Sequence, residues 1–212
     1  MLVVDKPAGI AVHASPGGGV ALESYFDALR FGLPKKPSLA HRLDRATSGC
    51  LVLGRHPKAL RRLGRLFSSG QVKKRYWAVV SSEPPESSGI IDLPLLKKGR
   101  DNHRWHMVVD ESGKPAQSEY RLLGRGDGCY WLELTPHTGR THQLRVHCAH
   151  MGFPIVGDYL YGSAESRKSS PPLHLHAQMI EIPLYPKRSA IIVEAQPPSH
   201  MIKLLQSCGY HL

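Results

Sequence analysis

Cysteine is scarce in this sequence, and the few cysteines that occur are scattered. They stand at Cys50, Cys129, Cys148 and Cys208. No two of them have the two-residue spacing of a zinc or redox site, so we expect buried, reduced thiols. Histidine is more frequent, but no His-Glu-x-x-His motif occurs, and His174 and His176 alternate in an extended run. The sequence therefore predicts no metal site.

Long apolar runs are also absent. No run approaches the roughly 18 residues that a membrane-spanning helix needs. The N-terminus lacks the charged and then apolar pattern of a signal peptide. These features favour a cytoplasmic protein with no membrane contact.

Acidic residues are fewer than basic residues, and this imbalance favours negatively charged partners. Lys and Arg number 28 against 17 Asp and Glu, which gives a net charge of +11 at pH 7. Such an excess favours binding to polyanions, because each neutralised phosphate releases counterions. Simple solubility is the alternative reading, and on charge alone we favour nucleic acid.

The pattern of predicted elements indicates one α+β domain over residues 1–212, with a large mixed or antiparallel sheet and helices packed against it. Neither repeats nor a second hydrophobic unit interrupt it. Predicted strands lie at Leu2–Val4, Ile10–His13, Cys50–Leu53, Lys74–Val80, Ile90–Leu95, Cys129–Thr135, Leu173–Ile182 and Ala190–Ala195, with a hairpin over Met107–Leu123. Predicted helices lie at Ala21–Phe31, Pro57–Phe67, from Thr138 or Thr141 to Met151, and at Met201–Cys208.

Two segments combine positive charge with features that suit RNA. In the helix Pro57–Phe67, apolar residues recur at helical spacing while Arg61, Arg62 and Arg65 fill the other side. That basic face is either an RNA contact or an ordinary solvated surface. The stretch Lys97–His106 places four basic residues around a tryptophan, and such interleaving suits base stacking combined with phosphate contact.

The segment HRLDRATSG, residues 41–49, places one carboxylate among cations. Asp44 is flanked by Arg42 and Arg45, and neighbouring positive charges favour the charged form of a carboxylate. Ser, Thr and Gly in the same segment allow a tight, hydrogen-bonded loop. An ionised, oriented Asp44 could act as a nucleophile, although an Asp between arginines is more often a structural ion-pair residue.

This segment resembles the signature of the RluA family of pseudouridine synthases, and other motifs match that family in order. They are LVVDKPAGIAVH at the N-terminus, then KKRYWAVV, GKPAQSEYRLL and PHTGRTHQLRVHCAHMGFPIVGDYLYG. The resemblance implies the pseudouridine synthase fold with a central active-site cleft. It also implies an enzyme that needs no cofactor and isomerises uridine in RNA.

Carried onto matching positions, the resemblance implies three catalytic residues. Asp44 would be the nucleophile, Arg145 would hold its carboxylate, and Tyr76 would stack on uracil and accept the proton from C5. From pattern alone, a tyrosine such as Tyr76 is more often an ordinary strand aromatic.

The expected RNA-binding residues surround these catalytic positions or lie on the basic helix. They are His41, Arg42, Arg45, Lys74, Arg140, His142, Arg61, Arg62 and Arg65. Arg42 would fill the gap that the flipped base leaves in the RNA. His41 could serve equally well as support for its loop.

The sequence departs from the family pattern at its N-terminus, where the family usually has more chain ahead of LVVDKPAG. We therefore expect a shortened first strand pair or a truncated N-terminus, and no room for an accessory RNA-binding domain. The resemblance to short members suggests a monomer that recognises a structured stem-loop in ribosomal or transfer RNA, read largely by shape.

Two other functions are compatible with parts of this pattern. The first is a catalytically idle RNA-binding protein of the same fold. The second is a glycoside or nucleoside hydrolase, but such enzymes ordinarily use two carboxylates, and no second acid accompanies Asp44 in a comparable motif.

Overall fold

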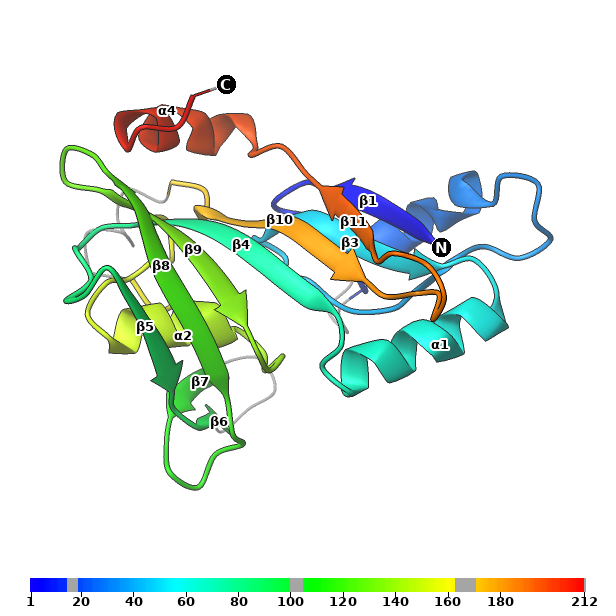
Figure 1. Cartoon of the computed structure of the whole chain (residues 1–212), viewed down its shortest axis with the longest axis horizontal. Coiled ribbons are helices and arrows are strands. Elements are labelled where there is room, and N and C mark those ends of the chain that lie inside the picture. The colour runs from blue at the N-terminus through cyan, green and yellow to red at the C-terminus, as the bar shows by residue number, and fades with distance from the viewer. Residues whose placement is uncertain (15–18, 100–104, 163–170, 212) are drawn as a thin grey trace. The chain divides into compact units, whose positions relative to one another are not determined.

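The computed structural model describes residues 1–14, 19–99, 105–162 and 171–211. The chain divides into two compact units, and each unit is built from two stretches of sequence. Unit 1 comprises Met1–Lys74 and Ala177–Gln196, and unit 2 comprises Arg75–His176 and Pro197–Leu212. Both contain strands and helices (Figure 1).

The sheet of unit 1 is built around β3, which lies between β1 and β10. The strands of this unit are β1 (Leu2–Lys6), β2 (Ser38–Leu39), β3 (Ser48–Gly54), β10 (Leu175–Ile182, which begins in unit 2) and β11 (Ile191–Glu194). β1 pairs antiparallel with β3, and β11 pairs antiparallel with β10. Every residue of β3 is buried, as its small and apolar sequence SGCLVLG allows. Gly49 has φ +104°, and a Cβ there would lie 2.3 Å from the carbonyl oxygen of Ala177, so the position requires glycine.

Two helical segments accompany the sheet of unit 1. They are η1 (Leu22–Leu29), a 3-10 helix, and α1 (Pro57–Ser68). His56 caps α1 because its Nδ1 accepts a hydrogen bond from the backbone N–H of Ala59, and Pro57 opens the first turn. Leu63 and Leu66 on the apolar side of α1 belong to a buried cluster with residues of β3 and β10.

Unit 2 contains an antiparallel sheet in the order β4-β9-β8-β5. The strands are β4 (Lys73–Val80, which begins in unit 1), β5 (Ser88–Asp92), β8 (Gln117–Arg125) and β9 (Tyr130–Pro136). A separate two-stranded ribbon is formed by β6 (Leu95–Lys98) and β7 (His106–Val109). The remaining elements are the helices α2 (Gln143–His150) and α4 (Ser199–Ser207).

Each helix of unit 2 has its own apolar contacts. Val146 of α2 packs with Leu95 and Met107 of the ribbon. Met201 and Leu205 of α4, both fully buried, pack into a cluster with residues of β4 and β9. The ribbon is thus attached to the helix that carries Arg145.

The predicted α+β class, with a large sheet and flanking helices, is confirmed, and most elements lie where the sequence places them. Four expectations are wrong in detail. The strand expected at Ile90–Leu95 is divided between β5, which ends at Asp92, and β6, which begins at Leu95 in the separate ribbon. The helix expected at Ala21–Phe31 is the shorter 3-10 helix η1. The segment Ile10–His13 is not a strand, and only Ala11 makes a bridge, to Ala21. The strands of the expected Met107–Leu123 hairpin pair elsewhere, β7 with β6 and β8 with β5 and β9.

The N-terminus of α2 also differs from the expectation. Neither Thr138 nor Thr141 caps it; His142 holds that position in the left-handed conformation with φ 53°. The hydroxyl of Thr138 instead donates to Gln143 and accepts from the backbone N–H of Gln117. Gly152, with φ +87°, follows the end of α2 as expected.

The described residues bear on three features that the sequence raised: the state of the cysteines, metal binding and membrane-spanning helices. All four cysteines are free and buried. Within the described ranges, no group of three or more potential metal ligands comes together. Among those same residues, no helix is long and apolar enough to cross a membrane. The organisation as one catalytic domain and the central cleft stay predictions.

Candidate active site

Asp44 begins a tight turn directly before β3. The backbone N–H of Thr47 donates to the carbonyl of Asp44 at 3.1 Å, which closes the turn. Thr47 is buried, whereas Asp44 itself is partly exposed. A partly exposed carboxylate on a turn anchored to a fully buried strand is held in place and can still be reached.

Lys6, at the end of β1, secures this turn from inside unit 1. Its side chain is fully buried, and its ammonium donates to the carbonyls of Pro7, Ile10 and Arg45 at 2.9, 2.9 and 3.2 Å. Burial lowers the pKa of Lys6 to about 8, and the nearby charge of Asp44 opposes that shift. Lys6 was not among the residues predicted for the site.

Backbone contacts tie the same turn to the loop after β1. The N–H of Gly9 donates to the carbonyl of Arg45, and Nε of Arg45 donates to the carbonyl of Gly9, both at 2.9 Å. Arg45 is therefore partly occupied in holding the turn. Arg42 lies two residues before Asp44 and is exposed.

His41 supports β3 by direct contacts. Its Nε2 accepts a hydrogen bond from the backbone N–H of Val52 at 3.0 Å, and its ring stacks on Phe67 of α1 with centroids 4.7 Å apart. Burial, and secondarily the charge of Lys74, lowers the pKa of His41 to about 4, so the ring is neutral at pH 7. These contacts favour the loop-support alternative for His41.

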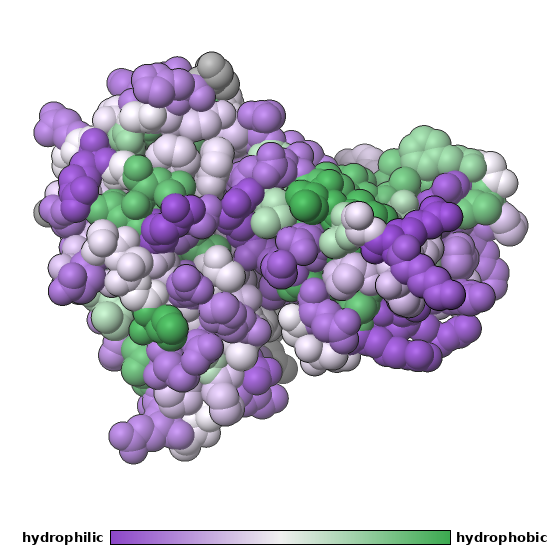
Figure 2. Space-filling view, in the orientation of Figure 1, coloured by the Kyte–Doolittle hydropathy of each residue, from purple (hydrophilic) through white to green (hydrophobic). Residues whose placement is uncertain are grey.

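The basic side of α1 has the arrangement that the sequence predicts. Arg61, Arg62 and Arg65 are exposed, opposite the buried Leu63 and Leu66. Figure 2 shows hydrophilic residues gathered over this helix. Nε of Arg62 also donates to the carbonyl of Leu184, so one of the three arginines has a structural contact as well.

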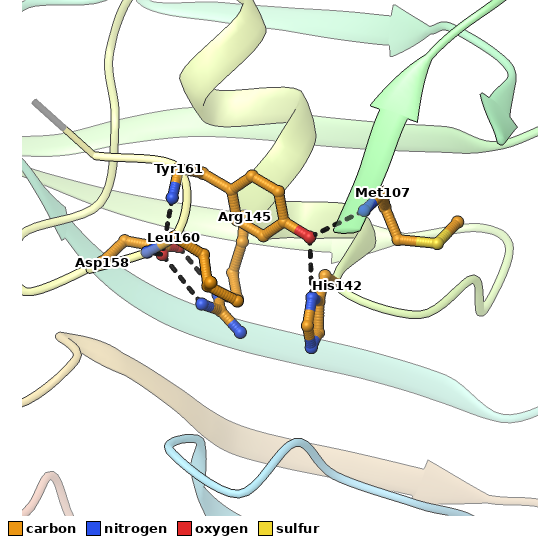
Figure 3. A network of polar contacts seen from close by, with 6 residues as sticks. All are labelled: Met107, His142, Arg145, Asp158, Leu160 and Tyr161. Carbon is orange, nitrogen blue, oxygen red and sulfur yellow. Dashed lines mark hydrogen bonds and ion pairs between the residues drawn. The ribbon is translucent and has the colours of Figure 1, made fainter. Parts of the chain in front are cut away.

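Unit 2 carries the other two expected catalytic residues. Tyr76 is half-buried in β4, opposite Leu134 of β9. Arg145, in α2, is only 3% exposed and forms a two-pronged ion pair with Asp158, with Nε–Oδ2 and Nη2–Oδ1 distances of 2.7 and 2.8 Å (Figure 3). Asp158 lies within the last motif quoted from the sequence, but it was not among the residues predicted for the site.

Two residues of the loop before α2 contact other segments of unit 2. Arg140 is exposed, and its Nε donates to the carbonyl of Pro115 at 2.9 Å. His142 shares a 2.8 Å hydrogen bond with the hydroxyl of Tyr161, and its ring stacks on Trp105 at 5.4 Å. The ammonium of Lys97 lies 4.7 Å from the centre of that tryptophan ring.

Lys97 and Trp105 lie on the segment Lys97–His106, which the sequence predicts to contact RNA, and they belong to unit 2 together with His142 and Tyr161. Arg100 and Arg104 of the same segment lie outside the described residues. Asp44 and Lys74 belong to unit 1, whereas Tyr76 and Arg145 belong to unit 2. The catalytic roles of Asp44, Tyr76 and Arg145, and their convergence, therefore stay predictions.

Comparison with known proteins identifies the family. A model of the RNA pseudouridylate synthase family matches residues 1–150. An uncharacterized RNA pseudouridine synthase of Zymomonas mobilis is 46% identical over 198 residues, 93% of this chain and 90% of that protein. The dual-specificity RNA pseudouridine synthase RluA of Escherichia coli is 39% identical over 186 residues, 86% of this chain and 82% of that protein.

A solved structure agrees with these relatives. Human RNA pseudouridylate synthase domain containing 4 matches with a TM-score of 0.80 and 26% identity, over 97% of this chain and 88% of that one. The motifs quoted from the sequence, the α+β fold and these relatives lead to one assignment. The chain belongs to the RluA family of RNA pseudouridine synthases and is an RNA isomerase.

Proposed function

We propose that Asp44 is the nucleophile of this synthase and that it acts on uridine in a structured stem-loop of ribosomal or transfer RNA. The observation that carries this proposal is the turn at Asp44. A partly exposed carboxylate stands on a turn that Lys6 and Gly9 fix from within. The backbone that carries this carboxylate is held at a position that a substrate can reach.

The reaction rearranges bonds within one nucleotide. Asp44 engages the uridine, the bond between uracil N1 and ribose C1′ breaks, and the uracil turns. C5 then bonds to C1′, the proton leaves C5, and N1 gains a proton. The atoms balance without an added reactant, which fits a site that needs no cofactor.

Arg145 and Tyr76 have complementary roles in this proposal. A guanidinium has five N–H donors, and Asp158 accounts for two of those of Arg145, so the group has the capacity to hold a second carboxylate, that of Asp44. Tyr76 stacks on the uracil and receives the C5 proton directly or through a water molecule.

RNA recognition is assigned to exposed cations near these residues. Arg42, exposed beside Asp44, fills the space of the flipped base. Phosphate contacts come from the arginines of α1, and Arg140, His142 and Lys74 contact phosphates or bases of the RNA. The E. coli relative is named a dual-specificity enzyme, and we extend that property to this chain as more than one RNA target. Because such RNAs reside in the cytoplasm, we place the enzyme there, acting as a monomer.

The decisive experiment uses Asp44→Asn, which preserves size and some hydrogen bonding but removes the negative charge. Tritium release from C5 of labelled uridine in RNA should fall below detection, while RNA binding persists. Turnover retained by this variant would contradict the assignment. No turnover by the parent protein would favour the idle RNA-binding alternative, and free uracil as product would favour the hydrolase.

A further inference from the structure

Asp158 is a buried carboxylate whose contacts concentrate on Arg145. It is 1% exposed, and its two oxygens each accept one N–H from the guanidinium, at 2.7 and 2.8 Å. Both residues belong to unit 2. A planar two-pronged pair of this kind fixes the plane of the guanidinium as well as its position.

The same carboxylate also shapes the chain that follows it. Oδ1 of Asp158 accepts the backbone N–H groups of Leu160 and Tyr161 at 3.0 and 3.1 Å, and its carbonyl accepts the N–H of Gly162 at 2.8 Å. This turn places the ring of Tyr161 beside the guanidinium of Arg145 (Figure 3). The guanidinium carbon Cζ lies 5.2 Å from the centre of that ring.

Tyr161 is in turn held at its far end. Its hydroxyl accepts the N–H of Met107 at 3.0 Å and shares a hydrogen bond of 2.8 Å with Nδ1 of His142. One short turn therefore supplies both the carboxylate of Asp158, which binds Arg145 through two hydrogen bonds, and the ring of Tyr161, which packs against the same guanidinium. The guanidinium is restrained in its plane by Asp158 and on a face by Tyr161.

Stability alone is a poor reason for this arrangement. A buried ion pair often contributes little or nothing compared with apolar residues of the same volume, because both charges lose their hydration. A rigid orientation of the charge, in contrast, is something that apolar packing cannot supply. Rigid placement matters most where the charge must meet a reacting group with little error.

We propose that Asp158 is a positioning residue for catalysis, which orients Arg145 toward the nucleophilic carboxylate. This inference rests on the proposed function, in which Arg145 holds Asp44. Asp158 itself does not touch the RNA. Its effect reaches the reaction only through the guanidinium.

The test measures the single-turnover rate and the RNA dissociation constant separately. In Asp158→Asn, the amide oxygen can still accept hydrogen bonds from the backbone N–H groups of Leu160 and Tyr161. The amide nitrogen, however, faces an N–H of Arg145, so the two-pronged ion pair is lost. Asp158→Glu keeps the negative charge but shifts the carboxylate that binds Arg145. We expect both variants to lose rate on the order of 100-fold with unchanged RNA affinity.

A destabilised control distinguishes this role from a loss of folding. Met201→Ala removes a fully buried side chain of α4, outside this network, and should lower the melting temperature without lowering the rate of folded protein. If Asp158→Asn and Asp158→Glu keep the parental rate, or lose it only as far as this control does, the positioning role is wrong.

A double variant provides the sharpest criterion. Arg145→Gln leaves Asp158 buried without its cationic partner, so adding Asp158→Asn should restore stability and leave the low rate of Arg145→Gln unchanged. A further loss of rate in the double variant would show that Asp158 acts by another route. An inactive Asp44→Asn alongside a fully active Asp158→Asn would refute this inference alone, whereas an active Asp44→Asn would refute the proposed function.

Discussion

Two buried charged groups account for much of the local geometry around the expected catalytic residues. The ammonium of Lys6 gathers three carbonyls around the turn of Asp44, and Asp158 grips Arg145 within unit 2. Each charge is costly to bury and is retained with several hydrogen bonds. At the scale of single residues, these buried charges therefore orient the turn of Asp44 and the guanidinium of Arg145.

The hydroxyl of Tyr76 is the next group to test. Tyr76→Phe keeps a ring that can stack on uracil but removes the proposed proton acceptor. We expect product formation from ordinary uridine to stall, while RNA containing 5-fluorouridine, which has no proton at C5, is processed nearly as well as by the parent. Parental turnover of ordinary uridine by this variant would reduce Tyr76 to a packing or stacking residue.

His41 predicts a dependence of stability on pH. Its pKa is about 4 in the folded protein against an ordinary value of 6.5, because of burial and the nearby charge of Lys74. Between these values the unfolded chain binds a proton that the folded chain does not, so the free energy of unfolding falls as pH drops from 6.5 toward 4.

The matched variant for this effect is His41→Gln, which keeps an acceptor for the N–H of Val52 and does not titrate. Denaturant unfolding at pH 7 and pH 5 should show a loss of stability that is larger in the parent by roughly 1–2 kcal/mol. Equal losses in the two proteins would mean that His41 is not held neutral in the fold.

At the scale of elements, α1 has two chemically different sides. Its apolar side packs in the core of unit 1, and its other side presents Arg61, Arg62 and Arg65. Replacing the three by Gln should weaken RNA binding and reduce the slope of log affinity against log salt by about 0.7 to 0.9 for each phosphate that is no longer neutralised. Arg62 should contribute least, since it also bonds the carbonyl of Leu184.

A control of equal charge tests whether location matters. Lys35→Gln, Lys36→Gln and Arg188→Gln together remove three charges elsewhere in unit 1. We expect this variant to keep more affinity and a steeper salt slope than the α1 variant. If both triple variants behave alike, only total charge matters and α1 is an ordinary solvated face.

The sequence predicts elements better than their partners. Periodicity placed α1 within one residue, since its apolar and charged positions alternate with a clear helical period. It could not show that β7 pairs with β6, because strand propensity does not specify which edge a strand joins. At the start of α2, the left-handed His142 occupies the place expected for a threonine cap, a tertiary effect with no local signature.

In the candidate site, too, local features can be predicted from the sequence and contacts between distant residues cannot. The turn at Asp44 follows from local composition, whereas Lys6 meets Arg45 across 39 positions of sequence. A signal for Asp158 did exist. Arg145 stands in a helix of otherwise mostly uncharged residues, and a buried guanidinium needs a carboxylate, which Asp158 supplies 13 residues later.

At the scale of the whole molecule, a net charge of +11 provides attraction for any RNA, and specificity must come from elsewhere. We therefore expect a folded stem-loop and an unpaired strand of equal length to bind similarly at low salt, but only the stem-loop to release tritium from C5. Changes that break the stem should abolish turnover, and compensating changes that restore pairing should restore it, because the proposed recognition depends on shape and splayed bases rather than a linear code. Turnover that follows the sequence around the uridine, regardless of pairing, would replace shape recognition with direct reading of bases.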